Sequence, residues 1–577
     1  MEKPIADLHC HPSLKPTANK EIKDLWVGTK NKGIWHFFKN ISVRKGLIRS
    51  ILKNMANYSQ SNLDNCYRGG NRLLVCSIYP FERPFMQPSR PFSKSTAIQK
   101  FILRIIFGKR IKRKIDRKII ELLTGISKEA AERYLHEIYE SGTINYFDDY
   151  RREYQYLKES NRSKSTNEEF NAQPAFELVG NYEEYLQKKA SNIICGIITV
   201  EGMHAMAQYD KKDLFEKESI TDLAPQNRMA LENSFKDNIR ELKTSKSFQY
   251  RPFFITLSHH FNNLISGHAK SFADAASSIK PGFADVFDQT KGMNKGISTF
   301  AKELIVNHLL SRENGGRILI DTKHMSLKAR DDFYNIIREF QLRGDAVPII
   351  CSHTAVNGIA TREAAGKQPD INRYEKKAYV SKFDINLTDQ DIREIFDTDG
   401  IIGICMHDGR MPGGKFKKYF KRISKMLKSA ESKKRIHAQM FLTNVFHILK
   451  VNLTHIRKLN RENPNANIEE RQAWKTISLG TDNDGIVDPF DHYNTAAKLR
   501  DFKLKLIDSI NWNDKPYMKK YKILSLPSEQ PFTQMELTNL MLGLTPEEIA
   551  DCVFYDNTHR FLSTYFTSEY LNGGLIV

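Results

Sequence analysis

The sequence predicts an α/β protein, a (β/α)8 TIM barrel with long, largely helical insertions. Eight short apolar runs with strand character recur along the 577 residues, and segments long enough for crossover helices separate them. Most of these runs end abruptly in a His, a Glu or an Asp. Because TIM barrels place their functional sites at the carboxyl ends of the strands, this third observation also predicts where a site lies.

The eight predicted strands are rich in β-branched or aromatic residues, as expected for parallel strands buried on both faces. They comprise residues 4–8, 73–78, 193–200, 253–258, 317–321, 347–352, 401–405 and 476–480. The gaps between the first three runs are far longer than a crossover helix requires. These gaps must therefore hold insertions.

Helix signals stand between and after the strands. Residues 297–310 carry apolar side chains at helical spacing. The Thr388 hydroxyl can cap a helix that has Asp391 in its first turn. Residues 545–548 form a capping box with proline at the first helical position.

We expect one barrel domain over residues 1–577, with an insertion-rich segment at 15–190 and a helical insertion at 416–471. A basic helical region occupies about residues 94–125: ten of residues 94–118 are Lys or Arg, and only Asp116 is acidic. The simplest interpretation is a solvated helix face packed on the main body. The alternative is contact with an anionic membrane surface or with nucleic acid. No recognised nucleic-acid module accompanies the charge, so no specific nucleic-acid partner is expected. Part of the segment is a candidate lid or subunit contact, which would make a homodimer.

Bulk properties exclude several classes of protein. No apolar run approaches the roughly 18 residues that a membrane span needs, and the N-terminus lacks a signal-peptide core, so a cytoplasmic protein is expected. The seven cysteines include no CxxC pair, which argues against a disulfide framework or a zinc ribbon. The net charge of +20 predicts attraction to anions in general and says nothing about fold.

The polar residues at the strand ends are the candidate site. His9 and His11 close the first run, and because side chains i and i+2 of a strand point to the same side, they project together. The other ends carry Glu201, His259, His324, His353 and Asp482. Taken singly, each histidine is more often a structural residue, and Asp482 and Asp484 would suit a simple turn. Their joint occurrence at successive strand ends predicts a ring of imidazoles and carboxylates around the barrel mouth.

Such a ring suits zinc, which accepts His nitrogen and carboxylate oxygen. Four histidines and one carboxylate are enough for two metal ions if Glu201 bridges them. Two adjacent divalent cations can share a water and lower its pKa towards neutrality, and Asp482 is placed to shuttle its proton.

Several motifs, in order along the chain, resemble the membrane (renal) dipeptidase family of zinc metallopeptidases, within the amidohydrolase superfamily. VEGMH is similar to the family's Val-Glu-Gly-Gly-His, and ITLSHHFNN is similar to Leu-Thr-Leu-Thr-His-x-x-Asn. ILIDTKHMS, VPIICSHTAV, SLGTDNDGI and the closing LTPEEIADCVFYDNTHRFL also resemble family segments. The resemblance covers most of residues 1–15, 190–410, 475–495 and 535–566.

The resemblance implies two metal ions per chain, most simply Zn²⁺, one held by His9 and His11 and the other by His324 and His353, with Glu201 bridging. Asp482 would be the proton shuttle. His259 would stabilise the oxyanion, with His260 as its rival. Arg362 would clasp the substrate's carboxylate, and Asn262 would also contact substrate.

Three departures from the family pattern concern the pocket. The family's usual first motif is His-X-Asp, whereas this chain has His9-Cys10-His11, which exchanges an anionic ligand for a neutral one. Met203 stands where the family has glycine. The segment after Arg362 and the insertions before the third strand are unlike typical members.

The leading hypothesis is a metal-dependent hydrolase in which a metal-bridging hydroxide cleaves the amide bond of a dipeptide or a related small N-acyl amino acid. One alternative is an amidohydrolase acting on another small amide, lactam or ester, reached through the altered loops. Another is a non-catalytic barrel scaffold that binds anionic partners through its basic insertion.

Overall fold

The computed structural model describes residues 3–17, 24–28, 59–86, 117, 127–272, 289–367, 375–418, 430–511 and 534–573. The predicted basic helical region of about residues 94–125 lies outside them, apart from Arg117. Among the described helices, none is long and apolar enough to cross a membrane.

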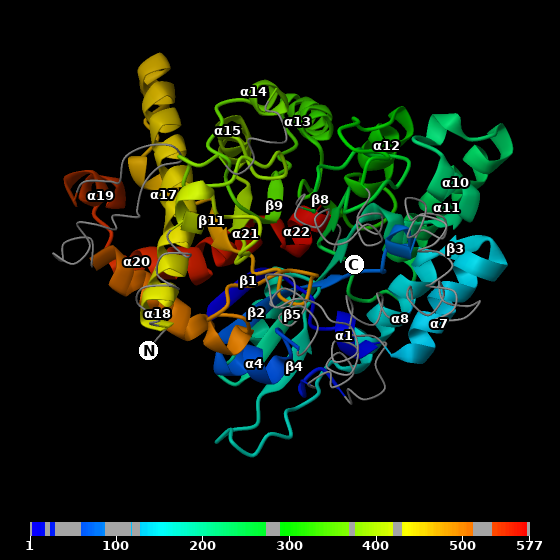
Figure 1. Ribbon diagram of the computed structural model, residues 1–577, viewed down its shortest axis with the longest axis horizontal. Coiled ribbons are helices and arrows are strands. Elements are labelled where there is room, and N and C mark those ends of the chain that lie inside the picture. The colour runs from blue at the N-terminus through cyan, green and yellow to red at the C-terminus, as the bar shows by residue number, and fades with distance from the viewer. Residues whose placement is uncertain are drawn as a thin grey trace, which may run out of the picture.

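Eight parallel strands form the centre of the molecule and confirm the predicted (β/α)8 TIM barrel (Figure 1). In spatial order they are β1 (Ile5–Cys10), β2 (Asn71–Ile78), β5 (Ile193–Glu201), β7 (Phe254–Thr256), β8 (Leu319–Asp321), β9 (Ile350–Thr354), β10 (Ile401–Ile404) and β11 (Ile477–Leu479). The ring closes between the last strand and the first. There the Asp482 amide donates to the His9 carbonyl at 2.9 Å, and the His11 amide donates to the Asn483 carbonyl at 2.9 Å.

The strands are buried on both faces, which is why they read as apolar runs in the sequence. Every residue of β1, β7, β8, β9, β10 and β11 is buried. Some polar residues inside the sheet are paired across strands. The Asp7 carboxylate of β1 accepts hydrogen bonds from the Thr481 hydroxyl at 2.6 Å and the Thr481 amide at 2.9 Å, so it fastens the closing seam.

Three short strands lie outside the predicted set. β4 (Ala175–Leu178) extends the sheet beside β5, and β3 (Thr143–Asn145) pairs antiparallel with β6 (Gln208–Asp210). Each has only three or four residues and mixes buried with partly or fully exposed positions, so none produces an apolar run.

The segment between β1 and β5 is largely helical where the structure describes it. Its helices are α1 (Leu14–Thr17), α4 (Leu63–Arg68), α7 (Lys128–His136), α8 (Tyr146–Glu159) and α9 (Tyr182–Lys188). A buried ion pair joins the end of β2 to α8, because Arg83 contacts Asp149 inside the fold. Figure 1 shows α7 and α8 grouped at one side of the barrel.

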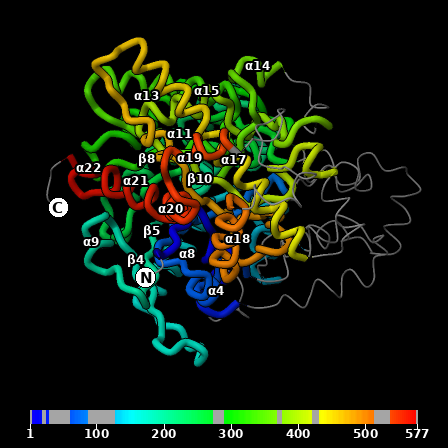
Figure 2. The backbone as a smooth tube through the Cα atoms, turned by 90° about the vertical axis from the view of Figure 1, so that its left-hand side faces the viewer, coloured from blue at the N-terminus to red at the C-terminus, as the bar shows by residue number. Residues whose placement is uncertain are grey.

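Helices cover the outside of the remaining strands. They are α10 (Lys211–Glu216), α11 (Pro225–Thr244), α12 (Thr299–Leu304), α13 (Leu327–Leu342), α14 (Arg362–Gly366), α15 (Asp389–Asp397), α17 (Ala430–Glu462), α18 (Leu499–Asn511), α19 (Gln534–Met541), α20 (Pro546–Asp551), α21 (Asn557–Tyr565) and α22 (Ser568–Asn572). The 33-residue helix α17 lies within the range predicted as an insertion, 416–471, and contacts α18 (Figure 2).

The predicted helix starts are confirmed. Thr388 and Thr545 each form a full capping box at the start of α15 and α20. The helix expected over residues 297–310 begins after Ser298, whose hydroxyl accepts from the Ala301 amide, and continues from α12 into a π-helical turn, Ile305–Leu309.

Candidate metal centre

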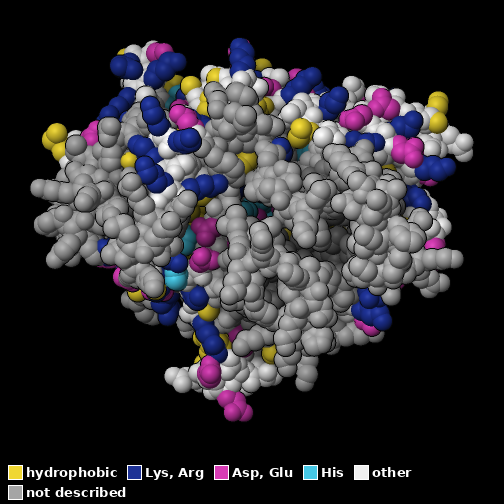
Figure 3. Space-filling view, in the orientation of Figure 1, with side chains coloured by type: hydrophobic (Ala, Val, Ile, Leu, Met, Phe, Trp, Pro, Cys, Tyr) yellow, Lys and Arg dark blue, Asp and Glu magenta, His cyan; other side chains and the backbone are white. Residues whose placement is uncertain are grey.

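Seven titratable side chains from six strand ends converge at the barrel mouth. They are His9, His11, Glu201, His259, His324, His353 and Asp482, and each is at most 5% exposed. The structure thus brings together all the predicted metal-ligating residues and both predicted catalytic residues. Figure 3 shows histidine and acidic side chains in a hollow near the middle of one face of the molecule.

Glu201 lies at the middle of this group. Its Oε1 is 3.5 Å from His9 Nε2, 3.3 Å from His324 Nε2 and 3.5 Å from His353 Nε2. Its Oε2 is 3.1 Å from His11 Nε2 and 3.3 Å from His259 Nε2. One carboxylate oxygen therefore faces each side of the group, as a bridging ligand requires.

The spacing of the donor atoms fits metal ions. Two ligand atoms on a tetrahedral zinc, at metal distances of 2.0–2.1 Å, stand about 3.3 Å apart. His324 Nε2 and His353 Nε2 are 3.3 Å apart, and Asp482 lies 3.7 Å from both His11 Nε2 and His353 Nε2. The buried Asp482 Oδ1 has no hydrogen-bond partner among the described residues. The donor set is thus one of nitrogen and carboxylate oxygen, pointing inwards at ligand spacing.

Two subsets could each hold an ion. The donor atoms of His9, Glu201, His353 and Asp482 lie within 4.8 Å of one another, as do those of His259, His260 and His324. His11 Nε2 is 3.0 Å from His9 Nε2 and borders the first subset. This grouping differs from the pairs that the family resemblance implies, since it places His9 with His353.

Burial and charge set the protonation of the centre. Burial alone would raise the pKa of Glu201, but the neighbouring His259, His9 and His11 hold that pKa well below its usual range. Burial and then the His259 charge lower the pKa of His324, while burial and then His9 lower that of His353. Neutral imidazoles and an ionised carboxylate are the forms that bind metals. Burial and the Glu201 charge raise the pKa of Asp482 to about 6.

His259 is held by a second carboxylate, Glu82. Glu82 Oε2 lies 2.6 Å from His259 Nδ1 and accepts the Tyr79 hydroxyl at 3.0 Å. Against the effect of burial, Glu201 and Glu82 raise the pKa of His259 to about 10. His259 therefore points a charged N–H towards the centre, and in that form it cannot be a ligand in the second subset. Its rival His260 is also buried there, but burial and the His259 charge hold the pKa of His260 well below its usual range.

Backbone conformation aims several of these groups. Gly202 follows Glu201 with φ +96°, and a Cβ there would overlap the His204 ring. His324 and Asp482 adopt φ +65° and +59°, a left-handed conformation that is costly for residues other than glycine and collects at functional sites.

A second layer of hydrogen bonds orients His353. Its Nδ1 lies 3.0 Å from the Ser352 hydroxyl, which donates to Asp321 at 2.6 Å. The Ser352 hydroxyl donates its one hydrogen to Asp321, so it can only accept from His353. His353 therefore carries its hydrogen on Nδ1, and the lone pair of its Nε2 is available to a metal ion.

Arg362 and Asn262, the predicted substrate-binding residues, bond other parts of the fold. The Arg362 guanidinium lies 2.5 Å from Asp331 and 3.1 Å from Asp391, over the Tyr334 ring. The Asn262 amide donates to the Lys217 and Glu218 carbonyls and accepts from the Leu264 amide. Both side chains are occupied in holding helices and loops.

Three charged residues at the mouth were missed by the sequence analysis: Glu82, Lys323 and Arg410. Glu82 follows β2 and Arg410 follows β10, the two strands to whose ends no polar group was assigned. Glu82 is the first charged residue after β2, so a search of every strand end could have found it, whereas His407 and Asp408 precede Arg410 after β10. Lys323 immediately precedes His324. Burial and then the Arg410 charge lower its pKa to about 8.

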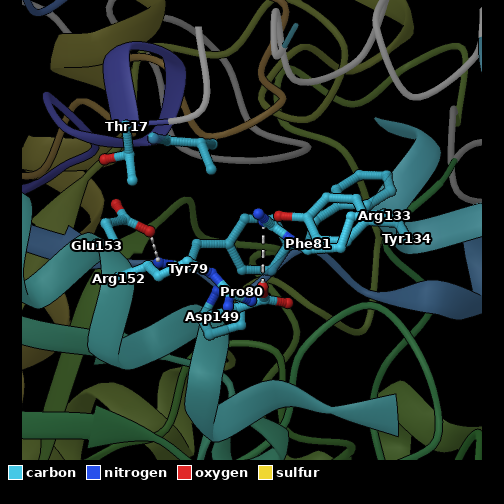
Figure 4. Close-up of a pocket in the computed structure, with 10 residues that line it drawn as sticks. Thr17, Tyr79, Pro80, Phe81, Arg133, Tyr134, Asp149, Arg152 and Glu153 are labelled. Carbon is cyan, nitrogen blue, oxygen red and sulfur yellow. Dashed lines mark hydrogen bonds and ion pairs between the residues drawn. The ribbon is translucent and has the colours of Figure 1, made fainter. Parts of the chain in front are cut away.

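A cavity adjoins the centre beyond Tyr79 (Figure 4). The Tyr79 ring lines it and also lies 4.6 Å from the His259 ring. Its lining residues are Leu14, Thr17, Tyr79, Pro80, Phe81, Arg133, Tyr134, Asp149, Arg152 and Glu153.

No family model and no curated protein matches the chain. Solved structures match at low identity. One is a dipeptidase described as a metallopeptidase of family M19, with 11% identity and a TM-score of 0.45 over 98% of this chain and 100% of that one. Another is a metallopeptidase from Rhodobacter sphaeroides liganded with a phosphinate mimic of the dipeptide L-Ala-D-Ala, with 11% identity and a TM-score of 0.43 over 98% and 99%.

A third match is the probable dipeptidase PvdM from Pseudomonas aeruginosa, with 12% identity and a TM-score of 0.33 over 88% of this chain and 89% of that one. At these identities and TM-scores the matches are likenesses only. The fold and the site rest on the strand order and the distances described above.

Proposed function

We propose that this protein is a metal-dependent hydrolase that cleaves the amide bond of a dipeptide or a related small N-acyl amino acid. The observation that supports it is the buried Glu201 carboxylate, with a different set of imidazoles facing each of its two oxygens. His9, His11, His324, His353 and Glu201 would hold two divalent ions, zinc by donor type. When bound, these ions supply an acidified water and a Lewis acid for the carbonyl oxygen.

The chain's own residues supply proton transfer and charge stabilisation. Asp482 Oδ1 is buried, faces the histidines and has no hydrogen-bond partner among the described residues, so it can take a proton from the attacking water and pass it to the leaving amine. His259 Nε2–H is held towards the centre by Glu82 and can donate to the developing oxyanion. The buried setting strengthens both interactions.

The test combines metal analysis with a substrate panel. We expect elemental mass spectrometry to find about two equivalents of zinc per chain. Glu201→Gln should lose at least one equivalent and nearly all turnover, whereas Glu363→Gln, which changes an exposed glutamate on α14, should behave as the wild type. The panel contains dipeptides, N-acyl amino acids, a lactam and an ester.

Each outcome assigns the function. Hydrolysis of dipeptides or N-acyl amino acids supports the proposal, and hydrolysis of only the lactam or the ester moves the substrate to the alternative class. Full metal content and full activity in Glu201→Gln would contradict the bridging role. A wild-type protein that takes up no zinc would contradict the hydrolase itself.

A further inference from the structure

Two buried cations at the barrel mouth lack partners. Lys323 is 1% exposed, and its Nζ has no hydrogen-bond partner among the described residues. Arg410 is 7% exposed, and its Nη1 likewise has no partner in the described parts of the chain. Lys and Arg side chains are almost never fully buried unless they are paired.

The two cations lie on the same side of the centre. Lys323 follows β8 and Arg410 follows β10, so the end of β9 lies between them. After burial, Arg410 is the strongest influence on Lys323, and it lowers the pKa of that amine. Burial raises the pKa of Cys405 and both cations oppose that rise, while burial followed by both cations lowers the pKa of His407, so the two cations act on the same segment after β10.

The carboxylates of the centre do not balance this charge. Glu201 faces five imidazoles, and Glu82 is bonded to His259. Asp482 interacts electrostatically with both Lys323 and Arg410, yet it also lies 3.9 Å from His9 and 3.7 Å from His11. Two like charges buried together repel each other, so negative charge from outside the chain would stabilise them.

We infer that Lys323 and Arg410 form a binding site for a doubly negative group on the substrate. This inference rests on the proposed function and narrows its substrate class to amides whose amino-acid part carries two negative charges. The planar guanidinium of Arg410 suits two-point binding of one carboxylate, and the compact ammonium of Lys323 suits a second charge beside it. An acidic amino acid with two carboxylates and a phosphoryl group share this chemistry.

Arg362 is not a competitor for this role. Its guanidinium is already shared between Asp331 and Asp391. An anion bound there would have to displace carboxylates that the fold already provides.

Calorimetric titration of zinc-loaded protein tests the site directly. The probes are glutarate as the dicarboxylate, butyrate as its singly charged counterpart, and inorganic phosphate. We expect glutarate or phosphate to bind at least tenfold more tightly than butyrate, and the tighter of the two identifies the source of the double charge. Lys323→Met and Arg410→Met should each weaken that binding at least tenfold. Arg343→Met, which removes an exposed charge at the end of α13, should not change it.

Thermal unfolding separates a binding role from a structural one. If the two cations repel each other, removing either one leaves the unfolding temperature of the ligand-free protein unchanged or raises it. A lower unfolding temperature in both variants, with unaltered probe binding, would overturn the inference. Equal affinity of the wild type for glutarate, phosphate and butyrate would also overturn it.

The outcomes distinguish this inference from the proposed function. Probe binding that depends on Lys323 and Arg410, in a protein that hydrolyses no amide, would retain the anion site and reject the hydrolase. Equal hydrolysis of neutral and acidic dipeptides, unaffected by both substitutions, would retain the hydrolase and reject the anion site.

Discussion

Single residues define the centre, and Glu201 contributes most to it. Its two oxygens lie 3.1–3.5 Å from five imidazole nitrogens that come from four other strand ends. The glycine that follows it lets the chain turn away at φ +96° without a side chain against His204. The departure at Met203 is accommodated, because that side chain is wholly buried beside the turn.

Glu82 is a positioning residue for His259, and its removal tests that role. Glu82→Gln keeps the shape but loses the charge that holds the His259 imidazolium, so we expect turnover to fall 10- to 100-fold with little change in metal content. Steady-state kinetics and elemental analysis measure the two quantities. The matched control is Glu153→Gln, because Glu153 is also a buried glutamate but bonds Ser13 and the Tyr79 amide.

Whether Glu82→Gln changes kcat or KM distinguishes a role in catalysis from a role in substrate binding. A group that supports the oxyanion acts in the transition state, so the effect belongs mainly to kcat. Equal losses in the Glu82 and Glu153 variants would mean that both glutamates act only through the fold.

The residues of the centre differ in how far the sequence alone predicts their place there. The places of His9 and His11 were predictable from their i, i+2 spacing, and those of the other strand-end residues from the ends of the apolar runs. Glu82 and Arg410 stand four and six residues beyond the last residues of β2 and β10. At that distance the direction of a side chain depends on the loop, which a strand pattern does not describe.

At the scale of elements, Arg362 is part of a network that joins α13, α14 and α15. Asp391 in α15 receives Arg362 at 3.1 Å and Arg330 at 2.7 Å, and it also accepts the Thr388 hydroxyl in the capping box. Asp391 is fully buried, so each of these bonds is shielded from water. The sequence motif placed an arginine after His353 correctly, but the surrounding helices decide what it binds.

Removing Arg362 should therefore cost stability. Breaking a buried ion pair that leaves a charge unpaired costs about 3 kcal/mol or more, but Arg330 still pairs with Asp391, so Arg362→Ala should lower the free energy of unfolding by about 1–3 kcal/mol while KM stays unchanged. Urea unfolding and steady-state kinetics measure these effects. Arg338→Ala is the control, because Arg338 pairs with Glu394 at the surface and should cost less than about 1 kcal/mol.

The same network predicts how the stability difference between the wild type and Arg362→Ala depends on pH. Although burial opposes ionisation, Arg330 and Arg362 hold the pKa of Asp391 below its ordinary value. Its stabilising effect is complete above pH of about 4, the pKa of Asp in the unfolded chain, and is lost as pH falls through the lowered pKa. The difference in free energy of unfolding between the wild type and Arg362→Ala should thus become smaller at acidic pH. Wild-type stability combined with a raised KM would return Arg362 to a substrate role.

At the scale of the whole molecule, the barrel could be predicted from the sequence because its strands are buried on both faces. Continuous apolar runs marked all eight strands, with ends shifted by only a few residues. The strands β3, β4 and β6 could not be predicted from the sequence, because they form only where distant segments meet. Thr143 pairs with Asp210, and Ala175 pairs with Ile193. The packing of α8 against the end of β2 is equally nonlocal, because it depends on Arg83 reaching Asp149.

Metal ions bound at the centre would couple their binding to the stability of the whole barrel. Its donors run from His9 to Asp482, and these two residues lie on either side of the closing seam, where the Asp482 amide bonds the His9 carbonyl. Ions held there would tie the first strand to the last. A ligand that binds only the folded state stabilises it by RT ln(1 + [L]/Kd), about 4 kcal/mol at a thousandfold excess over Kd.

Chelation should therefore lower the unfolding temperature of the wild-type protein by several degrees, and added zinc should restore it. Differential scanning calorimetry at constant protein concentration measures the shift. Glu201→Gln should show a smaller shift than the wild type, because it should hold less zinc, while Glu363→Gln should shift as the wild type does. If neither chelator nor zinc changes the unfolding temperature of the wild-type protein, no metal ion joins the first strand to the last. The strand-end histidines would then be structural residues of the barrel.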